Sequence, residues 1–128
     1  MTSRIALDTS ALMMPVELDV RLFEELDRIL DAYESVTPQP VLEELRRLSE
    51  KGGTEGTAAN VGRDLATDRC LVVDTEASYA DDALVELARE GLTEYVVTND
   101  LPLRDRVLEE NVPVIALRGR NKLAVTQP

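Results

Sequence analysis

The chain has 128 residues and a formal net charge of −11 at pH 7, from 25 acidic and 14 basic side chains. This length fits one domain over residues 1–128, and the apolar content of 44% is enough for a hydrophobic core. The charge argues against tight, nonspecific nucleic-acid binding, although it leaves room for a local basic patch. The absence of histidine excludes a histidine general base, a Ser–His triad and a His-ligated zinc site. Any catalysis must therefore use carboxylates, hydroxyls and arginines.

Further compositional signals concern the environment of the protein. The single cysteine, Cys70, cannot form an internal disulfide. No apolar run approaches ~18 residues and no signal pattern opens the chain, so we expect a cytoplasmic protein without a membrane partner. Only Lys51 and Lys122 are lysines. Excess acid with scarce lysine resembles proteins of salt-adapted archaea, where molar salt screens charge within ~3 Å.

An apolar run near the N-terminus ends abruptly in polar residues. Ile5, Ala6 and Leu7 predict a short strand buried on both faces, as a parallel sheet requires, and Asp8 follows directly. The ligand crevice of an open parallel sheet lies at the carboxyl ends of its strands. We therefore expect Asp8 to lie in such a crevice.

Segments with strand and helix periodicity alternate along the rest of the chain. The expected helices are a short turn or helix over 11–14 stopped by Pro15, then 17–33, a helix from Pro40, 57–68, 80–90 and 101–110. The expected strands are 35–37, 70–73, 94–98 and 112–117, with an edge strand over 122–125. Residues 51–56 break the helix before them and are interpreted as a linker. This alternation predicts an α/β domain with a central parallel sheet.

Asp100 repeats the arrangement of Asp8, because an apolar strand runs through Thr98 and Asn99 into a carboxylate. Two acids at the carboxyl ends of neighbouring parallel strands would point into one crevice. The alternative interpretation is that Asp100 only caps the helix that begins at Leu101.

Helical-wheel positions separate two further acids from their acidic neighbours. Glu44 lies at the flank of an apolar stripe and can border the crevice, whereas Glu43 falls nearly opposite and faces water. Asp81 lies at the edge of the next stripe, and Asp82 lies farther around the helix. The alternative is that Glu44 is an ordinary surface glutamate and that Asp81 and Asp82 complement the positive helix N-terminus.

Together these acids predict a metal site. A cluster of Asp8, Glu44, Asp81 and Asp100, with no histidine or lysine to neutralise it, would repel itself unless it bound a hard cation. Mg²⁺ and Mn²⁺ prefer such oxygen ligands. A metal held in this way lowers the pKa of bound water and stabilises charge on a phosphoryl oxygen, which is the chemistry of phosphodiester hydrolysis.

Four segments resemble the acidic motifs of PIN-domain nucleases, in order and over nearly the whole chain. These are Asp8-Thr9-Ser10, Val41-Leu42-Glu43-Glu44-Leu45, Ala80-Asp81-Asp82-Ala83-Leu84 and Val97-Thr98-Asn99-Asp100. The resemblance implies a three-layer α/β/α fold around a parallel sheet. It also implies a Mg²⁺- or Mn²⁺-dependent ribonuclease that cuts single-stranded RNA.

The resemblance also implies a role for each matched residue. The catalytic, metal-binding acids are Asp8, Glu44, Asp81 and Asp100. Ser10 stands at the usual polar position after the first acid, and Thr98 matches a hydroxyl residue that supports the site. Because the third motif has two acids, Asp82 stays open as the alternative ligand.

The resemblance leaves two branches of the family as candidates. The doubled acid of the third motif and the ending over 113–119 are similar to archaeal relatives of the PIN endonuclease that matures small-subunit rRNA in eukaryotes. PIN toxins of toxin–antitoxin pairs are the alternative. The partners implied are RNA, a second copy of the chain, and either an antitoxin or a ribosome-assembly partner.

Basic residues gather in the last quarter of the chain and could form an RNA-facing patch. They are Arg104, Arg106, Arg118, Arg120 and Lys122. The alternative is a set of scattered, solvated charges on an acidic protein.

Other functional classes fit less well. A phosphoacceptor receiver domain, with Asp74 as acceptor, would need an acidic pair at the first strand and a lysine after the last one. A haloacid-dehalogenase-type phosphatase would need a second aspartate where Ser10 stands. A PIN fold that only binds RNA or supports assembly is a third alternative, against which the intact set of acids argues.

Overall fold

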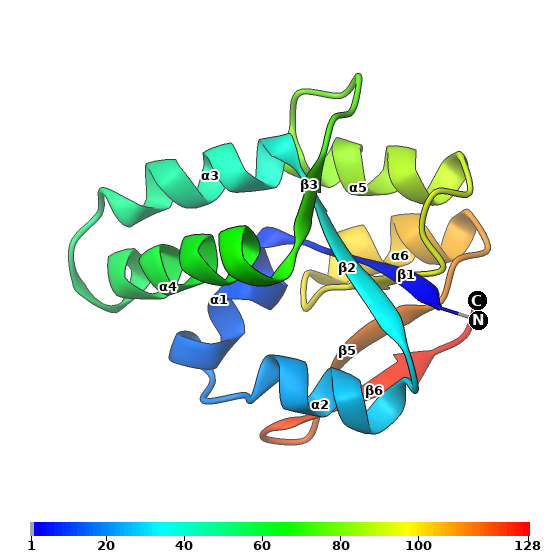
Figure 1. The fold of residues 1–128 in the computed structure, drawn as a ribbon, viewed down its shortest axis with the longest axis horizontal. Coiled ribbons are helices and arrows are strands. Elements are labelled where there is room, and N and C mark those ends of the chain that lie inside the picture. Colours follow the sequence, from blue (N-terminus) through cyan, green and yellow to red (C-terminus); the bar gives the residue numbers. More distant parts are fainter. Residues whose placement is uncertain (1) are drawn as a thin grey trace.

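The computed structural model describes residues 2–128, and its sheet has the strand order β3-β2-β1-β4-β5-β6 (Figure 1). The strands are β1 (Ser3–Leu7), β2 (Tyr33–Pro38), β3 (Leu71–Val73), β4 (Tyr95–Val97), β5 (Val114–Arg118) and β6 (Lys122–Thr126). The first five are parallel, whereas β6 pairs antiparallel with β5. The predicted α/β fold is therefore confirmed. The edge strand expected over 122–125 is also present as β6, and it runs antiparallel because it follows β5 through a tight turn, which joins only antiparallel strands.

The helices divide into two sets according to the direction of the crossover that contains them. They are α1 (Thr9–Glu17), α2 (Leu22–Ile29), α3 (Gln39–Ser49), α4 (Gly53–Arg69), α5 (Ala80–Arg89) and α6 (Leu101–Glu109). The crossovers from β1 to β2 and on to β3 contain α1 to α4, and those to β4 and β5 contain α5 and α6. Since such crossovers are right-handed, the two sets cover opposite faces of the sheet. The strand order reverses between β1 and β4, which is where such sheets bind ligands.

β1 is central to the core because its neighbours cover both edges and both faces. It pairs with β2 on one side and with β4 on the other, and Ile5, Ala6 and Leu7 are fully buried. Gly62 of α4 lets that helix approach α1 closely, since a Cβ there would lie 3.0 Å from the Leu12 carbonyl oxygen. α4 therefore packs closely against α1, the helix that directly follows β1 and Asp8.

The single helix expected over 17–33 is wrong. α1 passes through Pro15 and ends at Glu17, and α2 begins only at Leu22. Between them Asp19 has a positive φ of 53°, a conformation that aspartate tolerates better than most residues. This turn redirects the chain before α2 forms.

The glycine-rich segment before residue 57 is also not a linker, because α4 already begins at Gly53. Gly56 lies inside this helix, where a Cβ would lie 1.8 Å from the Lys51 carbonyl oxygen. Glycine there allows the tight turn between α3 and α4, which lie side by side (Figure 1). No helix within residues 2–128 has the length and apolar character needed to cross a membrane.

Candidate active site

Asp8 is held at the sheet's switch point by hydrogen bonds from two strand ends. It follows β1 directly, and its side chain caps α1 by accepting the Ala11 backbone N–H at 2.8 Å. Ser10 Oγ lies 2.8 Å and 3.0 Å from its two carboxylate oxygens. From the end of β4, the Thr98 hydroxyl donates to Asp8 Oδ2. A buried carboxylate, 3% exposed, therefore has a fixed orientation.

The buried position of Asp8 changes its acidity. Burial raises the pKa of the Asp8 carboxyl from its ordinary value of 3.8 to about 7. The hydrogen bonds from Thr98, the Ala11 backbone and Ser10 oppose this rise, and the negative charge of Asp81 adds to it. Among residues 2–128 no cationic side chain pairs with Asp8. The site thus holds a carboxylate whose charge is costly without a counter-ion.

Glu44 reaches this crevice from α3. It is half-buried, and the Thr9 hydroxyl, next to Asp8 in the chain, donates to its Oε1. Glu43 is exposed and lines a different hollow, with Arg46 and Arg63. The structure therefore places Glu44 beside the start of α1 and turns Glu43 away.

Asp81 and Asp82 occupy the first turn of α5 but face different neighbours. Partial burial raises the pKa of Asp81, and the negative charges of Asp100 and Glu44 raise it further. Asp82 instead accepts a hydrogen bond from Arg106 of α6 at 2.9 Å, as an exposed ion pair. Asp81 is thus the acid of this pair that the other crevice carboxylates influence most.

Asp100 has both of the roles considered from the sequence. Its Oδ1 caps α6 by accepting the Leu103 backbone N–H at 2.9 Å. Its own N–H donates to Thr98 Oγ1 at 3.0 Å, so the hydroxyl that holds Asp8 also positions Asp100. A cap and a crevice carboxylate are therefore compatible in one residue.

The chemistry of these donors fits a hard divalent cation. Asp8, Glu44, Asp81 and Asp100 offer only carboxylate oxygens. Burial is the main cause that raises the pKa of Asp8 and of Asp81, and repulsion from neighbouring carboxylates adds to both rises. No ion pair within residues 2–128 neutralises any of the four. Their side chains do not, however, form a ready coordination group in the described part of the chain, where no three acidic or cysteine residues are close enough to hold an ion. The four residues therefore fit a hard divalent cation in the type of their donor atoms and in their charge.

Comparison with known proteins identifies the fold family. The sequence profile of the PIN like domain matches residues 5–120. The chain belongs to the PIN-like domain family. Ribonuclease VapC4 from Methanocaldococcus jannaschii is 33% identical over 121 residues, which cover 91% of this chain and 92% of that protein.

Solved structures agree on the fold of this PIN-like domain. The PIN domain endonuclease Utp24 has a TM-score of 0.79 at 24% identity, over 98% of this chain and 92% of that one. VapBC2 from Rickettsia felis, bound to a DNA fragment from their promoter, has a TM-score of 0.57 at 16% identity, over 90% of this chain and 99% of that one. The receiver-domain alternative does not hold, and Asp74 is an exposed residue after the edge strand β3.

Three of the basic residues in the last quarter of this PIN-like domain line two hollows that share Arg118: one with Arg104, and one with Lys122, which is paired with Arg118 in the β5–β6 register. Arg104 and Arg118 both line a hollow that begins at Thr98 and Asn99. Arg106 pairs with Asp82, and Arg120 is exposed in the turn between β5 and β6. Only Arg104 and Arg118 therefore adjoin the crevice through a shared hollow.

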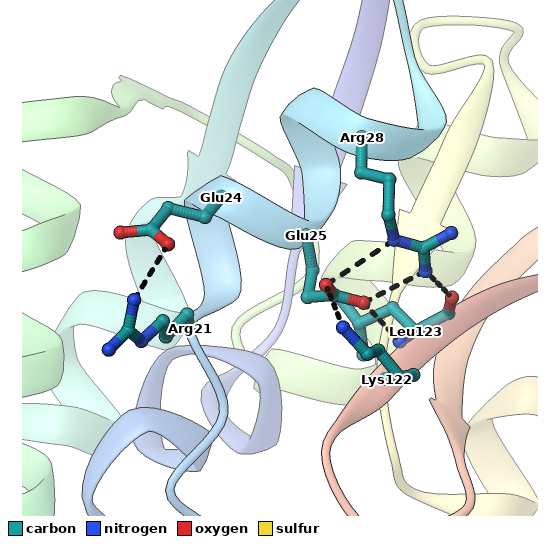
Figure 2. A network of polar contacts seen from close by, with 6 residues as sticks. All are labelled: Arg21, Glu24, Glu25, Arg28, Lys122 and Leu123. Carbon is teal, nitrogen blue, oxygen red and sulfur yellow. Dashed lines mark hydrogen bonds and ion pairs between the residues drawn. The ribbon is translucent and has the colours of Figure 1, made fainter.

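Lys122 also belongs to a network of polar contacts that joins α2 to β6. Figure 2 shows the buried Glu25 carboxylate among Arg28, Lys122 and the backbone of Leu123. Hydrogen bonds from Arg28 and the Leu123 N–H lower the pKa of Glu25 to about 2. This network orients the edge strand, so Lys122 contributes to structure as well as to surface charge.

Two residues of the site were not singled out from the sequence. Thr9 holds Glu44, and Asn99 accepts the Leu117 N–H at 2.9 Å through its side chain while its own N–H donates to Ser10 Oγ at 3.0 Å. Asn99 thus joins the ends of β4 and β5 behind the carboxylates. The only sequence signal for either was its position beside a motif acid.

Proposed function

We propose that this PIN-like domain is a metal-dependent endoribonuclease that cuts single-stranded RNA. The observation that carries the proposal is the placement of Asp8, which is buried at the β1–β4 switch point. The charge of Asp81 acts on Asp8, and the charges of Glu44 and Asp100 act on Asp81. None of the four acids has an ion-pair partner within residues 2–128. Its relative Ribonuclease VapC4, at 33% identity over most of both chains, supports the ribonuclease activity.

The residues proposed to hold Mg²⁺ or Mn²⁺ are Asp8, Glu44, Asp81 and Asp100, with Asp82 as the alternative third ligand. When bound, such an ion would activate water and stabilise charge on the phosphate under attack. The negative charges of Asp8 and Asp81 are costly without such an ion, which is the physical reason for the coupling between the site and a divalent cation.

The surrounding hydroxyls and amides orient these acids. Ser10 and Thr98 fix the Asp8 carboxylate, and Thr9 fixes one oxygen of Glu44. The Leu103 backbone N–H, in the first turn of α6, fixes one oxygen of Asp100. Partners that hold metal-ligating carboxylates in place typically change metal affinity or activity 10- to 100-fold when removed, so these hydroxyls are expected to matter almost as much as the acids.

The test is cleavage of an end-labelled single-stranded RNA in molar salt with Mg²⁺, Mn²⁺ or a chelator. Cleavage should occur with either metal and stop in chelator, and Asp8→Asn should abolish it while the protein stays folded. Calorimetric titration of Mn²⁺ gives a second readout, in which wild type binds and Asp8→Asn does not. A protein that binds RNA but cuts none with any divalent ion would instead be a binding or assembly module.

Two biological roles fit this activity. The similarity to Ribonuclease VapC4 favours a toxin held by an antitoxin, and the fold shared with Utp24 is consistent with RNA processing. Induced expression separates them: a toxin should arrest growth in a manner that Asp8→Asn removes. A processing enzyme should leave growth unchanged and cut only particular precursors.

A further inference from the structure

A hollow of about 460 Å³ lies beside the crevice, between the end of α1, the start of α6 and the strands β5 and β6. Thr98 and Asn99 form its wall on the side of the carboxylates. Since Thr98 also hydrogen-bonds to Asp8, the hollow and the crevice share a residue. A chain that lies across the carboxylates would therefore pass over this hollow.

The hollow exists because small residues face one another across the β5–β6 pair. Ala116 is paired with Ala124 in the antiparallel register, and both line the hollow. Leu18 and Leu101 add apolar walls and remain 42% and 59% exposed. The result is an open, mostly apolar depression that can accept a flat group.

The charges that line the hollow are opposite in sign to those of the crevice. Arg104 and Arg118 both contribute to it, in a protein with a net charge of −11. Arg118 has no ion-pair partner among residues 2–128, and Arg104 pairs only with its exposed neighbour Asp105. An occupant should thus combine an apolar face with negative charge.

We infer that this hollow binds the base of a nucleotide next to the scissile phosphate, an inference that rests on the proposed ribonuclease function. The base would lie on Ala116 and Ala124 between the two leucines, and Arg104 and Arg118 would contact its phosphates. Guanidinium groups serve both purposes, because they pair with phosphate and stack on bases. Among residues 2–128 no aromatic side chain lines the hollow, so recognition should tolerate any base while requiring one to be present.

An abasic scan of the RNA tests this inference on the wild-type protein. A short single-stranded RNA is made with one abasic nucleotide at each position in turn, and binding is followed by fluorescence anisotropy in chelator. An abasic nucleotide next to the cleavage site should weaken binding about fivefold, the lower end of the range for a stacked base, and other positions should change it little. A flat profile would overturn the inference, and it is also the result expected if the hollow binds a protein segment instead.

Matched variants locate the effect in the hollow. Ala124→Phe fills the hollow, so this variant should bind intact and abasic RNA equally. Ala32→Phe changes an exposed position before β2, and this variant should still bind intact RNA more tightly than abasic RNA, as wild type does. Arg118→Ala should weaken binding more than Arg21→Ala, which removes the same charge from an exposed site that does not line this hollow. Melting curves show whether each variant is folded, and an Ala124→Phe protein that still discriminates contradicts the inference.

The two proposals fail in different ways. Cleavage with a flat abasic profile would overturn the base-binding hollow and leave the nuclease standing. A position-specific abasic effect without cleavage under any divalent ion would overturn the nuclease and the placement of the base next to a scissile phosphate, and would leave only base binding by the hollow standing.

Discussion

The hydroxyl of Thr98 hydrogen-bonds to the carboxylate of Asp8, a residue 90 positions earlier in the chain. The same oxygen accepts the backbone N–H of Asp100 at 3.0 Å. One atom at the end of β4 therefore positions the first and the last acid of the crevice. This bridge spans the switch point of the sheet, where β1 and β4 lie side by side.

Thr98→Val should weaken the site and the fold together. Valine keeps the shape of threonine but leaves Asp8 and the Asp100 N–H without their shared partner, at a cost of about 1–3 kcal/mol. Because the Thr98 hydrogen bond lowers the pKa of Asp8, its loss should raise that pKa and move the pH profile of cleavage upward. Chemical denaturation and rate–pH profiles measure the two effects.

Thr93→Val is the matched control for this change. Thr93 is also buried and bonds to backbone carbonyls at the opposite end of β4. Its loss should lower stability by a similar amount without moving the pH profile. Equal shifts in the two variants would mean that Thr98 has only a structural role.

The metal-free protein should lose stability as the pH rises from about 4 to 7. Asp8 has a pKa of about 7 when folded and an ordinary value of 3.8 when unfolded, so the folded state binds more protons between these values. Its contribution therefore becomes unfavourable above about pH 4 and reaches its full cost, as much as about 4 kcal/mol, above pH 7. Urea denaturation in chelator at pH 5, 6, 7 and 8 should show wild type falling relative to Asp8→Asn. A difference that does not depend on pH would show that Asp8 is charged in the folded protein throughout.

The order of strands and helices was predictable because apolar periodicity is a local property of the sequence. Asp8, Glu44 and Asp100 were predicted as site residues for a related reason, since strand ends and helix flanks fix which way a side chain faces. Asp19, by contrast, ends the expected 17–33 helix through a backbone conformation that periodicity does not record.

Contacts between distant residues could not be predicted in this way. The hydrogen bond from Thr9 to Glu44 and the one from the Leu117 N–H to Asn99 join segments whose spacing depends on packing. The ion pair between Lys122 and Glu25 likewise depends on the antiparallel direction of β6 relative to β5. A pattern of residue types shows that a carboxylate is present, and only the fold shows its partner.

Salt should stabilise the metal-free protein. With a net charge of −11, like charges repel across the surface, and molar salt reduces the screening length to about 3 Å. The melting temperature should therefore rise between low salt and roughly 2–3 M KCl. A chloride series with a chelator present separates screening from divalent binding, and an unchanged or falling melting temperature would contradict the prediction.

Glu25 should contribute stability at neutral pH that is lost in acid. Its pKa is lowered to about 2 in the folded protein, so its contribution is complete above its ordinary value of 4.5 and disappears as the pH falls through 2. Glu25→Gln should cost about 1–3 kcal/mol at pH 7, because it weakens bonds to Arg28, Lys122 and Leu123 (Figure 2). Glu24→Gln, which breaks only an exposed pair with Arg21, should change stability by less than about 1 kcal/mol. Equal effects in urea denaturation would show that the buried network adds nothing.

Asp81 and Asp82 should differ sharply in a single cleavage assay. Asp81 is coupled to Asp100 and Glu44, so Asp81→Asn should lower the cleavage rate about a hundredfold or more. Asp82 pairs with Arg106 at the surface, so Asp82→Asn should reduce the rate only slightly, and Arg106→Ala should behave in the same way. Calorimetry with Mn²⁺ should show weakened binding for Asp81→Asn alone. If Asp82→Asn abolishes cleavage and Asp81→Asn does not, the third ligand is Asp82, and the ion pair with Arg106 must open before the metal binds.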